Sequence, residues 1–452
     1  MSDSGAAVPA HEELKKALGP ITLWGLGVGY VISGMYFGWN LGLPEGGPYG
    51  MLVATLLTTL LYVTFTFGYA ELACAMPRAG GTFVYAGRAL GPRFAVVGGI
   101  AQWVEFVFAP PAIALAIGAY LALFFPGISP FAFALGAYVL FTGVNVIGVK
   151  LSAAVELVVT VLAVGELLVF AGVTAPHVSM ASFTANALPH GWWGILPALP
   201  YAIWFYLGIE GVANVAEEAK NPSRNIPLGF GSAMATLVVL TLLTFGCAVA
   251  VSGWESVVFK PGSTETSDSP LPLALSHIVG PEHVAYKLLV GIGLFGLIAS
   301  FHGLVLASGR ATFELGRAGY APRPLGRILH GRQTPAIALV ANLVCGVIAM
   351  ASGRTEDVIN LSVFGALTMY AAATISLIVL RRREPTLERP FLAPFYPAVP
   401  VIALSLTLLC LASMVWFHPR IALLFCGIVA AAFVSAALFG AKVSPATSSS
   451  PG

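Results

Sequence analysis

Long apolar runs separated by short polar segments make up most of this chain. About twelve runs of roughly 18–28 mostly apolar residues occur, each long enough to cross a hydrocarbon core about 30 Å thick as a helix. The pattern therefore predicts an all-α membrane protein. The expected transmembrane helices lie at residues 21–43, 49–76, 94–125, 130–147, 151–173, 195–216, 228–253, 285–312, 335–352, 358–380, 396–417 and 421–440.

The basic residues fall between these runs, and they favour one side. If the N-terminus lies inside, only Lys260, Lys287, Arg354 and Arg420 fall outside, and the other 18 of the 22 Lys and Arg residues fall inside. Such a positive-inside bias orients a multi-pass protein. We therefore expect both termini to be cytoplasmic, in a protein of the inner (plasma) membrane.

Composition supports a single membrane domain in a lipid bilayer. Charged residues form 9% of the chain and hydrophobic residues 58%, and the mean hydropathy is +0.87. A net charge of +2 gives no indication of nucleic-acid binding. We expect a cytoplasmic tail at residues 1–20, one transmembrane domain at 21–440 and a disordered cytoplasmic tail at 441–452. The polar connection 254–283 is expected to form a surface cap.

Two runs are interrupted near mid-membrane by glycine-rich sequence. The first contains GLGVGYVISGMYFGWN at residues 25–40, and the sixth contains WFYLGIEG at 204–211. Unwound backbone at membrane depth is tolerated only where it is buried in protein or lines a cavity. A matched pair of broken helices indicates the binding site of a transporter, and positions one and six imply two inverted five-helix repeats. The alternative is that these glycines only permit close helix packing.

Several ionisable residues lie well inside the runs, and no Lys or Arg accompanies them at depth. A buried carboxylate costs at least about 2.5 kcal/mol, so each one requires a partner or a proton. The missing partner could be a transported proton, a metal cation or an amine, whereas a protonated Glu could instead bridge two helices. The residues are Glu71, Glu105, Glu156, Glu166, Glu210 and His302.

Glu210 is the strongest candidate among them because it follows the expected break at Gly208. A carboxylate beside the free carbonyls of a half-helix forms a site for an ammonium group, although a bracing hydrogen bond is the alternative. Glu71 lies near the inner end of its run, where anchoring of helices is favoured. Glu105 and Glu166 are candidates for proton coupling, and His302 could titrate near neutral pH or pack as a neutral side chain.

Four stretches resemble one family. The chain resembles the amino acid–polyamine–organocation permeases over about residues 14–440, and within them it is most similar to the ethanolamine permease branch. AEL…MPRAGG and GIE…AEE…NPSRNIP are specific to that superfamily, while ISG…FGWN and SFHG point to the amine branch. The stretches are residues 30–43, 69–92, 199–229 and 298–322.

This resemblance implies two inverted five-helix repeats plus two further helices, with substrate between the breaks of the first and sixth helices. It implies that Trp204 is an aromatic gate and that Ser300 of the eighth helix faces the first. The candidates for substrate binding are Ile32, Ser33, Gly34, Met35, Tyr36, Trp204, Tyr206, Leu207, Gly208 and Glu210. The candidates for coupling are Glu71, Glu105, Glu166, Ser300 and His302.

The chain departs from the family pattern at three places. Ile32 replaces the first glycine of the usual run at the first break, which weakens an anion site and favours an amine without a carboxylate. Ala163 stands where some members carry a coupling lysine. No acidic residue lies near Met35, where many amine-branch members have one, so the identity of the substrate stays open.

We therefore expect a secondary active transporter that imports ethanolamine or a similar small amine by alternating access, coupled to protons. The alternative within the superfamily is a permease or exchanger for neutral or cationic amino acids. Sodium coupling would need carbonyl groups of the first helix and hydroxyl groups of the eighth. Ser300 is a single hydroxyl there, so sodium coupling stays open. Eight scattered histidines give no metal site and argue against a membrane enzyme, and we expect no cofactor. A channel would need a selectivity-filter repeat, which this sequence does not show. A non-transporting sensor on the same fold is a further alternative, although we recognise no added signalling domain in the sequence.

Overall fold

The structure is a computed structural model that describes residues 18–77, 80–148, 153–329 and 334–439. Within these ranges nine helices are long and apolar enough to span a membrane, and further shorter apolar helices accompany them. The elements of the bundle are α1 (Pro20–Val31) with α2 (Ser33–Tyr36) and η1 (Trp39–Gly42), α3 (Leu43–Ala75), α5 (Pro92–Phe124), α6 (Pro130–Ile147), α7 (Ala153–Thr174), α9 (Ile195–Trp204) with η4 (Ile209–Glu218), α10 (Pro222–Ser252), α13 (Val284–Arg317), α14 (Ala336–Ala351), α15 (Thr355–Arg383), α16 (Ala398–Phe417) and α17 (Pro419–Phe439).

Each of the twelve predicted runs is helical in the structure, so the all-α fold class is confirmed. The first and sixth runs are the two that are split into short pieces, as their glycine content predicted. Several boundaries were set too tightly: α3 begins at Leu43 rather than near 49, α10 begins at Pro222 rather than near 228, and α13 continues to Arg317 rather than ending near 312. In the last two cases a polar turn extends the helix beyond the apolar run, and such a turn carries no hydropathic signal. The expected tails at 1–20 and 441–452 fall almost entirely outside the described residues.

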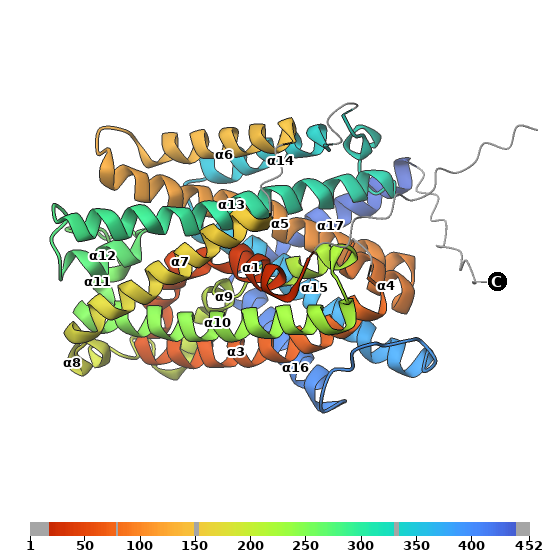
Figure 1. The fold of residues 1–452 in the computed structure, drawn as a ribbon, viewed down its shortest axis with the longest axis horizontal. Helices are drawn as coiled ribbons and strands as arrows, with labels where there is room; N and C mark the ends of the chain where they lie inside the picture. The colour runs from red at the N-terminus through yellow and green to blue at the C-terminus, as the bar shows by residue number, and fades with distance from the viewer. Residues whose placement is uncertain (1–17, 78–79, 149–152, 330–333, 440–452) are drawn as a thin grey trace, which may run out of the picture.

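The broken helices lie inside the bundle (Figure 1). α1 packs against α10, α7 and α13, while α9 packs against α3 and α16. α6 and α14 pack together along one edge of the bundle. This arrangement leaves the two interrupted segments surrounded by protein, which satisfies the condition for irregular backbone at membrane depth.

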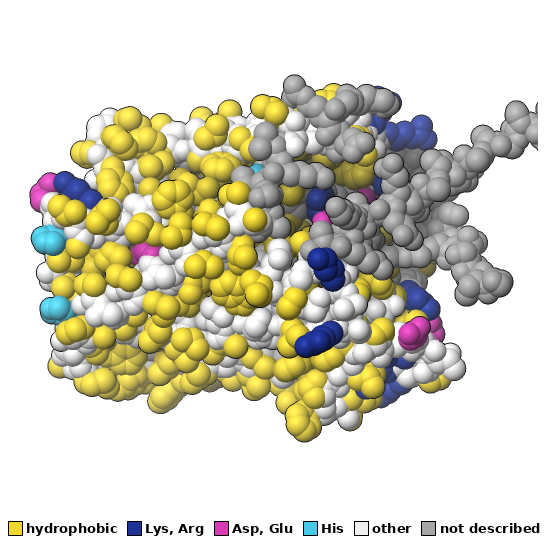
Figure 2. All heavy atoms as spheres, viewed as in Figure 1, with side chains coloured by type: hydrophobic (Ala, Val, Ile, Leu, Met, Phe, Trp, Pro, Cys, Tyr) yellow, Lys and Arg dark blue, Asp and Glu magenta, His cyan; other side chains and the backbone are white. Residues whose placement is uncertain are grey.

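Lys and Arg gather at one end of the bundle, which we call the basic end (Figure 2). α3, α13 and α15 end there and α10 begins there, and the broad band between the two ends is hydrophobic. At the opposite end Lys260 and Lys287 are paired with Glu265 and Glu282. The uneven charge agrees with the bias read from the sequence.

The connection 254–283 folds over the opposite end through α11 (Glu255–Val258) and α12 (Pro270–Ser276). Asn40 Nδ2 donates to the Ser267 carbonyl oxygen at 2.8 Å and to the Val257 carbonyl oxygen at 3.4 Å. Thr355 Oγ1 donates to Asp268 Oδ2 at 2.9 Å, which ties the connection to the start of α15. The expected surface cap is therefore present and is fixed to both repeats.

Candidate functional site

The first break separates α1 from α2 at Ile32. Ser300 of α13 lies at this break: its hydroxyl donates to the Tyr30 carbonyl oxygen at 2.6 Å and is 2.8 Å from Ser33 Oγ. Interrupted helices leave carbonyl groups without an amide partner, and buried backbone groups need one. The hydroxyl of Ser300 supplies it, so the position expected for Ser300 is the observed one.

The second break follows Trp204, where α9 ends. Residues 205–208 form a turn, and Gly208 has φ +97°, a left-handed conformation that side chains with a Cβ adopt at a cost. Beyond it the chain continues as the 3₁₀ helix η4 through Glu218. Such a long 3₁₀ segment is unusual, and in the middle of a helix it often marks a functional hinge.

The two breaks touch each other. A Cβ built on Gly34 would lie 2.4 Å from the Trp204 carbonyl oxygen, so only glycine allows this approach. The Trp204 indole packs edge-on against Phe37, with ring centroids 5.4 Å apart, and its Nε1 has no hydrogen-bond partner among the described residues. A buried indole N–H without an acceptor costs free energy, so this donor is available to a ligand.

A pair of carboxyl groups lies directly beyond the second break. Glu210, in the first turn of η4, and Glu105 of α5 are fully buried and lie against each other. Tyr370 of α15 donates its hydroxyl to Glu210 Oε2 at 3.0 Å, and Tyr62 of α3 lies 3.0 Å from the Tyr370 hydroxyl. Glu210 Oε1 and both oxygens of Glu105 receive no hydrogen bond from a donor in the described chain.

This pair has a definite chemical capacity. Two carboxylates that share a buried site repel each other, so they favour holding one proton between them. The pair carries two negative charges when both groups are ionised, so one shared proton and one ammonium group beside it compensate the pair together. The pair can therefore hold a proton and the charge of a bound amine at the same time.

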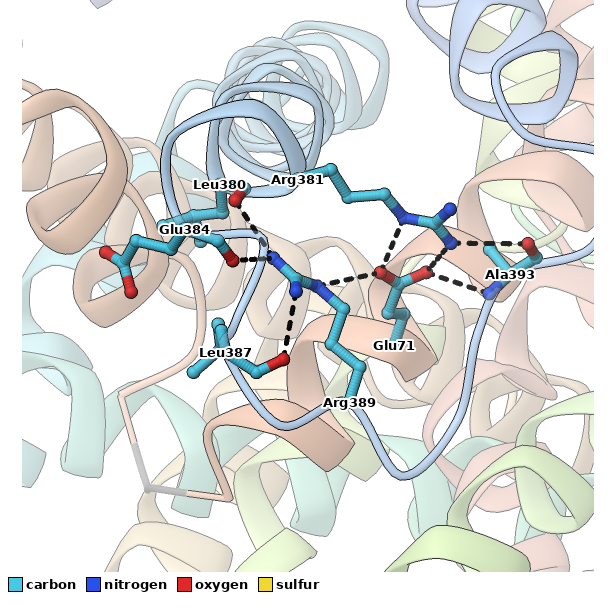
Figure 3. Close-up of polar contacts among 7 residues, drawn as sticks. All are labelled: Glu71, Leu380, Arg381, Glu384, Leu387, Arg389 and Ala393. Carbon is cyan, nitrogen blue, oxygen red and sulfur yellow. Dashed lines mark hydrogen bonds and ion pairs between the residues drawn. The ribbon is translucent and has the colours of Figure 1, made fainter.

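Glu71 has the opposite surroundings, although it is also fully buried (Figure 3). Arg381 Nε donates to Glu71 Oε1 at 2.8 Å and its second nitrogen donates to Oε2, while Arg389 Nε lies 3.4 Å from Oε1. The Ala393 amide adds a bond of 2.8 Å. The expectation that no Lys or Arg accompanies the intramembrane acids is thus wrong for Glu71. Its partners come from the end of α15 and from the loop 384–397, which folds back onto the bundle.

Three of the expected site residues lie apart from the breaks. Tyr36 turns away from α9, and its hydroxyl donates to Glu166 Oε2 at 2.7 Å and to the Ala163 carbonyl oxygen at 3.2 Å. His302 lies against α6, with its Nδ1 3.3 Å from Asn145 Nδ2. Tyr36 and Glu166 therefore form a separate cluster, and His302 belongs to the contact between α13 and α6.

The remaining candidates stay close to the breaks. Ile32, Met35 and Leu207 are buried there, and the Met35 carbonyl oxygen accepts from Trp39 Nε1 at 3.0 Å. The Tyr206 hydroxyl is 2.6 Å from Thr59 Oγ1, on the side of α3. The structure also adds Tyr370 and Tyr62, which the sequence analysis did not single out. Tyrosines in apolar runs are ordinary, and only the facing of their helices distinguishes these two.

Comparison with known proteins gives consistent relatives. The profile described as amino acid permease matches residues 18–451. An uncharacterized transporter of Rhizobium meliloti is 28% identical over 90% of this chain and 88% of its own length. The branched-chain amino acid permease of Bacillus subtilis is 25% identical over 92% of each chain, and a methylthioribose transporter of the same organism is 26% identical over 89% of each.

Proposed function

Because the chain belongs to the amino acid permease family, we propose that it is a proton-coupled transporter of small amino acids that works by alternating access. The family and its relatives make it a transporter and not an enzyme. One observation carries the coupling proposal: the Glu105–Glu210 pair is buried beside two broken helices in contact and receives no cation from the described chain.

In this proposal substrate lies between the breaks. Its ammonium group meets Glu210 and the carbonyl end of α9, where the helix dipole is negative. Its carboxylate meets the backbone of the first break at Ser33 and Gly34. Trp204 covers the substrate, and its indole N–H gains the acceptor that it lacks in the described structure. A cation beneath an aromatic face gains about 1–2 kcal/mol when it is desolvated.

Coupling follows from the charge of the pair. When the site is open to the outside, a proton enters the Glu105–Glu210 pair and the ammonium group binds next to it. The broken helices then rock against the rest of the bundle and open the site at the basic end, which we propose faces the cytoplasm of the cell membrane. Tyr370 keeps Glu210 in position through both states because its hydroxyl can follow the carboxyl group.

Ethanolamine is the second candidate substrate, and Ile32 is the observation that favours it. Ile32 is fully buried at the first break, where it fills space beside the backbone that would receive a carboxylate. An amine without a carboxylate needs no hydrogen bonds from that backbone.

Uptake into proteoliposomes separates these candidates. Vesicles with an inward proton gradient, in sodium-free buffer, are given labelled leucine, alanine, arginine or ethanolamine in turn. We expect gradient-stimulated accumulation of an amino acid. Accumulation of ethanolamine alone would overturn the amino acid assignment, and accumulation that responds to sodium rather than to protons would overturn the coupling.

A further inference from the structure

An apolar cavity of about 350 Å³ lies between α3 and α10, away from the breaks. Its wall on α3 repeats at helical spacing, and so does its wall on α10. Thr66 is the single polar side chain of the lining, and its hydroxyl has no partner among the described residues. The lining residues are Val63, Thr66, Phe67, Ala70, Pro227, Phe230, Gly231, Met234, Ala235 and Val238.

The cavity occupies one half of the membrane. Pro227 is 5 residues inside the basic end of α10 and Val238 is 16 residues inside it, so the wall extends about 16 Å along the helix at about 1.5 Å per residue. This length is about half of a hydrocarbon core of about 30 Å. Counted from Pro227, at the start of the apolar run of α10, the cavity therefore has about the depth of one leaflet.

A basic residue, Arg224, lies about one helical turn before the first lining residue of α10. Arg224 lies on the same face of α10 as Pro227 and Gly231, because it precedes them by three and seven residues. Arg224 is exposed, and among the side chains that the structure describes no acidic one lies within ion-pair distance of it. Side chains on a helix lean toward its N-terminus, which here is the basic end, so Arg224 reaches toward the depth of the head groups.

We propose that this groove is a binding site for an anionic phospholipid of the leaflet at the basic end. One acyl chain fills the space between α3 and α10, and Arg224 holds the phosphate. Water would find almost no polar partners on these walls, so an acyl chain suits them better. A basic residue at the end of an apolar, leaflet-deep groove matches the two parts of such a lipid.

The chain offers a matched pair of substitutions to test the groove. A Cβ on Gly231, in the lining, meets nothing within 4 Å, and the same holds for Gly246, farther along α10 and outside the lining. Gly231→Leu would place an apolar side chain in the groove from a Cβ that meets no neighbour, and Gly246→Leu is its control. Arg224→Gln removes the cation, and Arg93→Gln removes another exposed arginine at the basic end.

Native mass spectrometry of the purified protein, with phosphatidylglycerol or phosphatidylcholine added, counts and identifies the retained lipid. We expect the wild type to retain one phosphatidylglycerol in preference to phosphatidylcholine. Gly231→Leu should lose it while Gly246→Leu keeps it. Arg224→Gln should lower the preference about fivefold, since one basic residue near an anionic surface contributes about 1 kcal/mol, and Arg93→Gln should leave it unchanged.

Other results would overturn the proposal. Equal lipid retention by Gly231→Leu and Gly246→Leu would show that the groove holds no lipid. An unchanged preference for phosphatidylglycerol in Arg224→Gln would show that Arg224 does not bind the head group. If the wild type is a dimer and Gly231→Leu is a monomer, the groove is occupied by a second copy of the chain. If the molecule retained from the purification is a sterol, the groove binds a sterol and not a phospholipid.

Discussion

Glu71 and Glu210 are both fully buried glutamates in the membrane domain, but their partners differ in kind. Glu71 is bound by two guanidinium groups and a backbone amide at the basic end (Figure 3). Glu210 has one tyrosine hydroxyl and a second carboxyl group, that of Glu105. The first carboxylate is neutralised by the chain, whereas the second is not.

This difference separates a structural acid from a transporting one. A carboxylate with fixed cations has its charge compensated within the chain, because the guanidinium groups supply the opposite charge. A carboxyl pair without cations must take its compensating charge from outside the chain, as a proton or as an ammonium group. Only the second arrangement can link substrate binding to proton movement.

The largest predicted effect is on Glu210. Glu210→Gln should lower gradient-driven accumulation of substrate by about 100-fold or more, the scale seen when a proton-transferring group is lost. Exchange of labelled for unlabelled substrate across the same vesicles should persist at a higher substrate concentration, because Glu105 and the carbonyl end of α9 still meet the ammonium group. Loss of both activities to the same degree at saturating substrate would mean that Glu210 supports folding or binding alone and not coupling.

The next effect is on stability and concerns Glu71. Arg381→Gln should destabilise the purified protein by about 3 kcal/mol, since the buried carboxylate loses the guanidinium that donates to both of its oxygens and keeps only Arg389, 3.4 Å away, as a cation. Thermal unfolding measures it.

Arg88→Gln is the matched control for that stability effect. Arg88 pairs with Glu384 at 2.6 Å, but both side chains are more than a third exposed, at 44% and 34%. Exposed pairs contribute about 0–1 kcal/mol, so the control should change little. A loss in Arg88→Gln as large as that in Arg381→Gln would contradict the distinction between the two pairs.

A smaller effect is expected at Tyr370. Tyr370→Phe removes the hydroxyl that donates to Glu210 Oε2, and a hydrogen bond to a charged acceptor contributes about 1.5–3 kcal/mol. The pH dependence of uptake should shift while the amount of folded protein stays the same. Tyr138→Phe, whose hydroxyl contacts the Asn342 carbonyl oxygen near the edge of the bundle, should leave the pH dependence unchanged.

The smallest effect is at Asp268, a carboxyl group whose close partner is a neutral hydroxyl. Loss of hydration raises the pKa of Asp268 to about 6, against the opposing effects of Thr355 and Lys260. The folded state therefore holds a proton that the unfolded chain has released, and stability falls as pH rises from about 4 to 6. Asp268→Asn should remove this fall and stabilise the protein at pH 7 by less than about 1 kcal/mol, because the side chain is half-buried. Melting temperatures at pH 4.5 and 7.5 test it, with Glu265→Gln as control.

Much of the fold could be predicted from the sequence because a bilayer imposes a length and a polarity on every spanning helix. The breaks were also predictable, since Gly34 and Gly208 stand in runs that otherwise read as continuous helices. Glu210 was predictable as an acid next to a break. These features depend on local sequence alone.

The partners of the acids could not be predicted, because they depend on how the helices face each other. A hydropathy pattern cannot show that the Tyr370 hydroxyl contacts Glu210 or that the Tyr36 hydroxyl contacts Glu166. The cations of Glu71 were missed for another reason: Arg381 lies at the end of α15 and Arg389 in a loop that folds back onto the bundle. A side chain that reaches an acid from outside an apolar run leaves no signal within it.

The central claim is that the Glu105–Glu210 pair carries the transported proton. Its most direct test is the pH inside vesicles, followed with a trapped dye, when substrate is added outside without any imposed gradient. We expect substrate to acidify the interior of wild-type vesicles, and we expect Glu210→Gln vesicles, preloaded with unlabelled substrate, to exchange it without acidification. Acidification of the same size in Glu210→Gln vesicles would contradict it, and the proton would then have to move through another group.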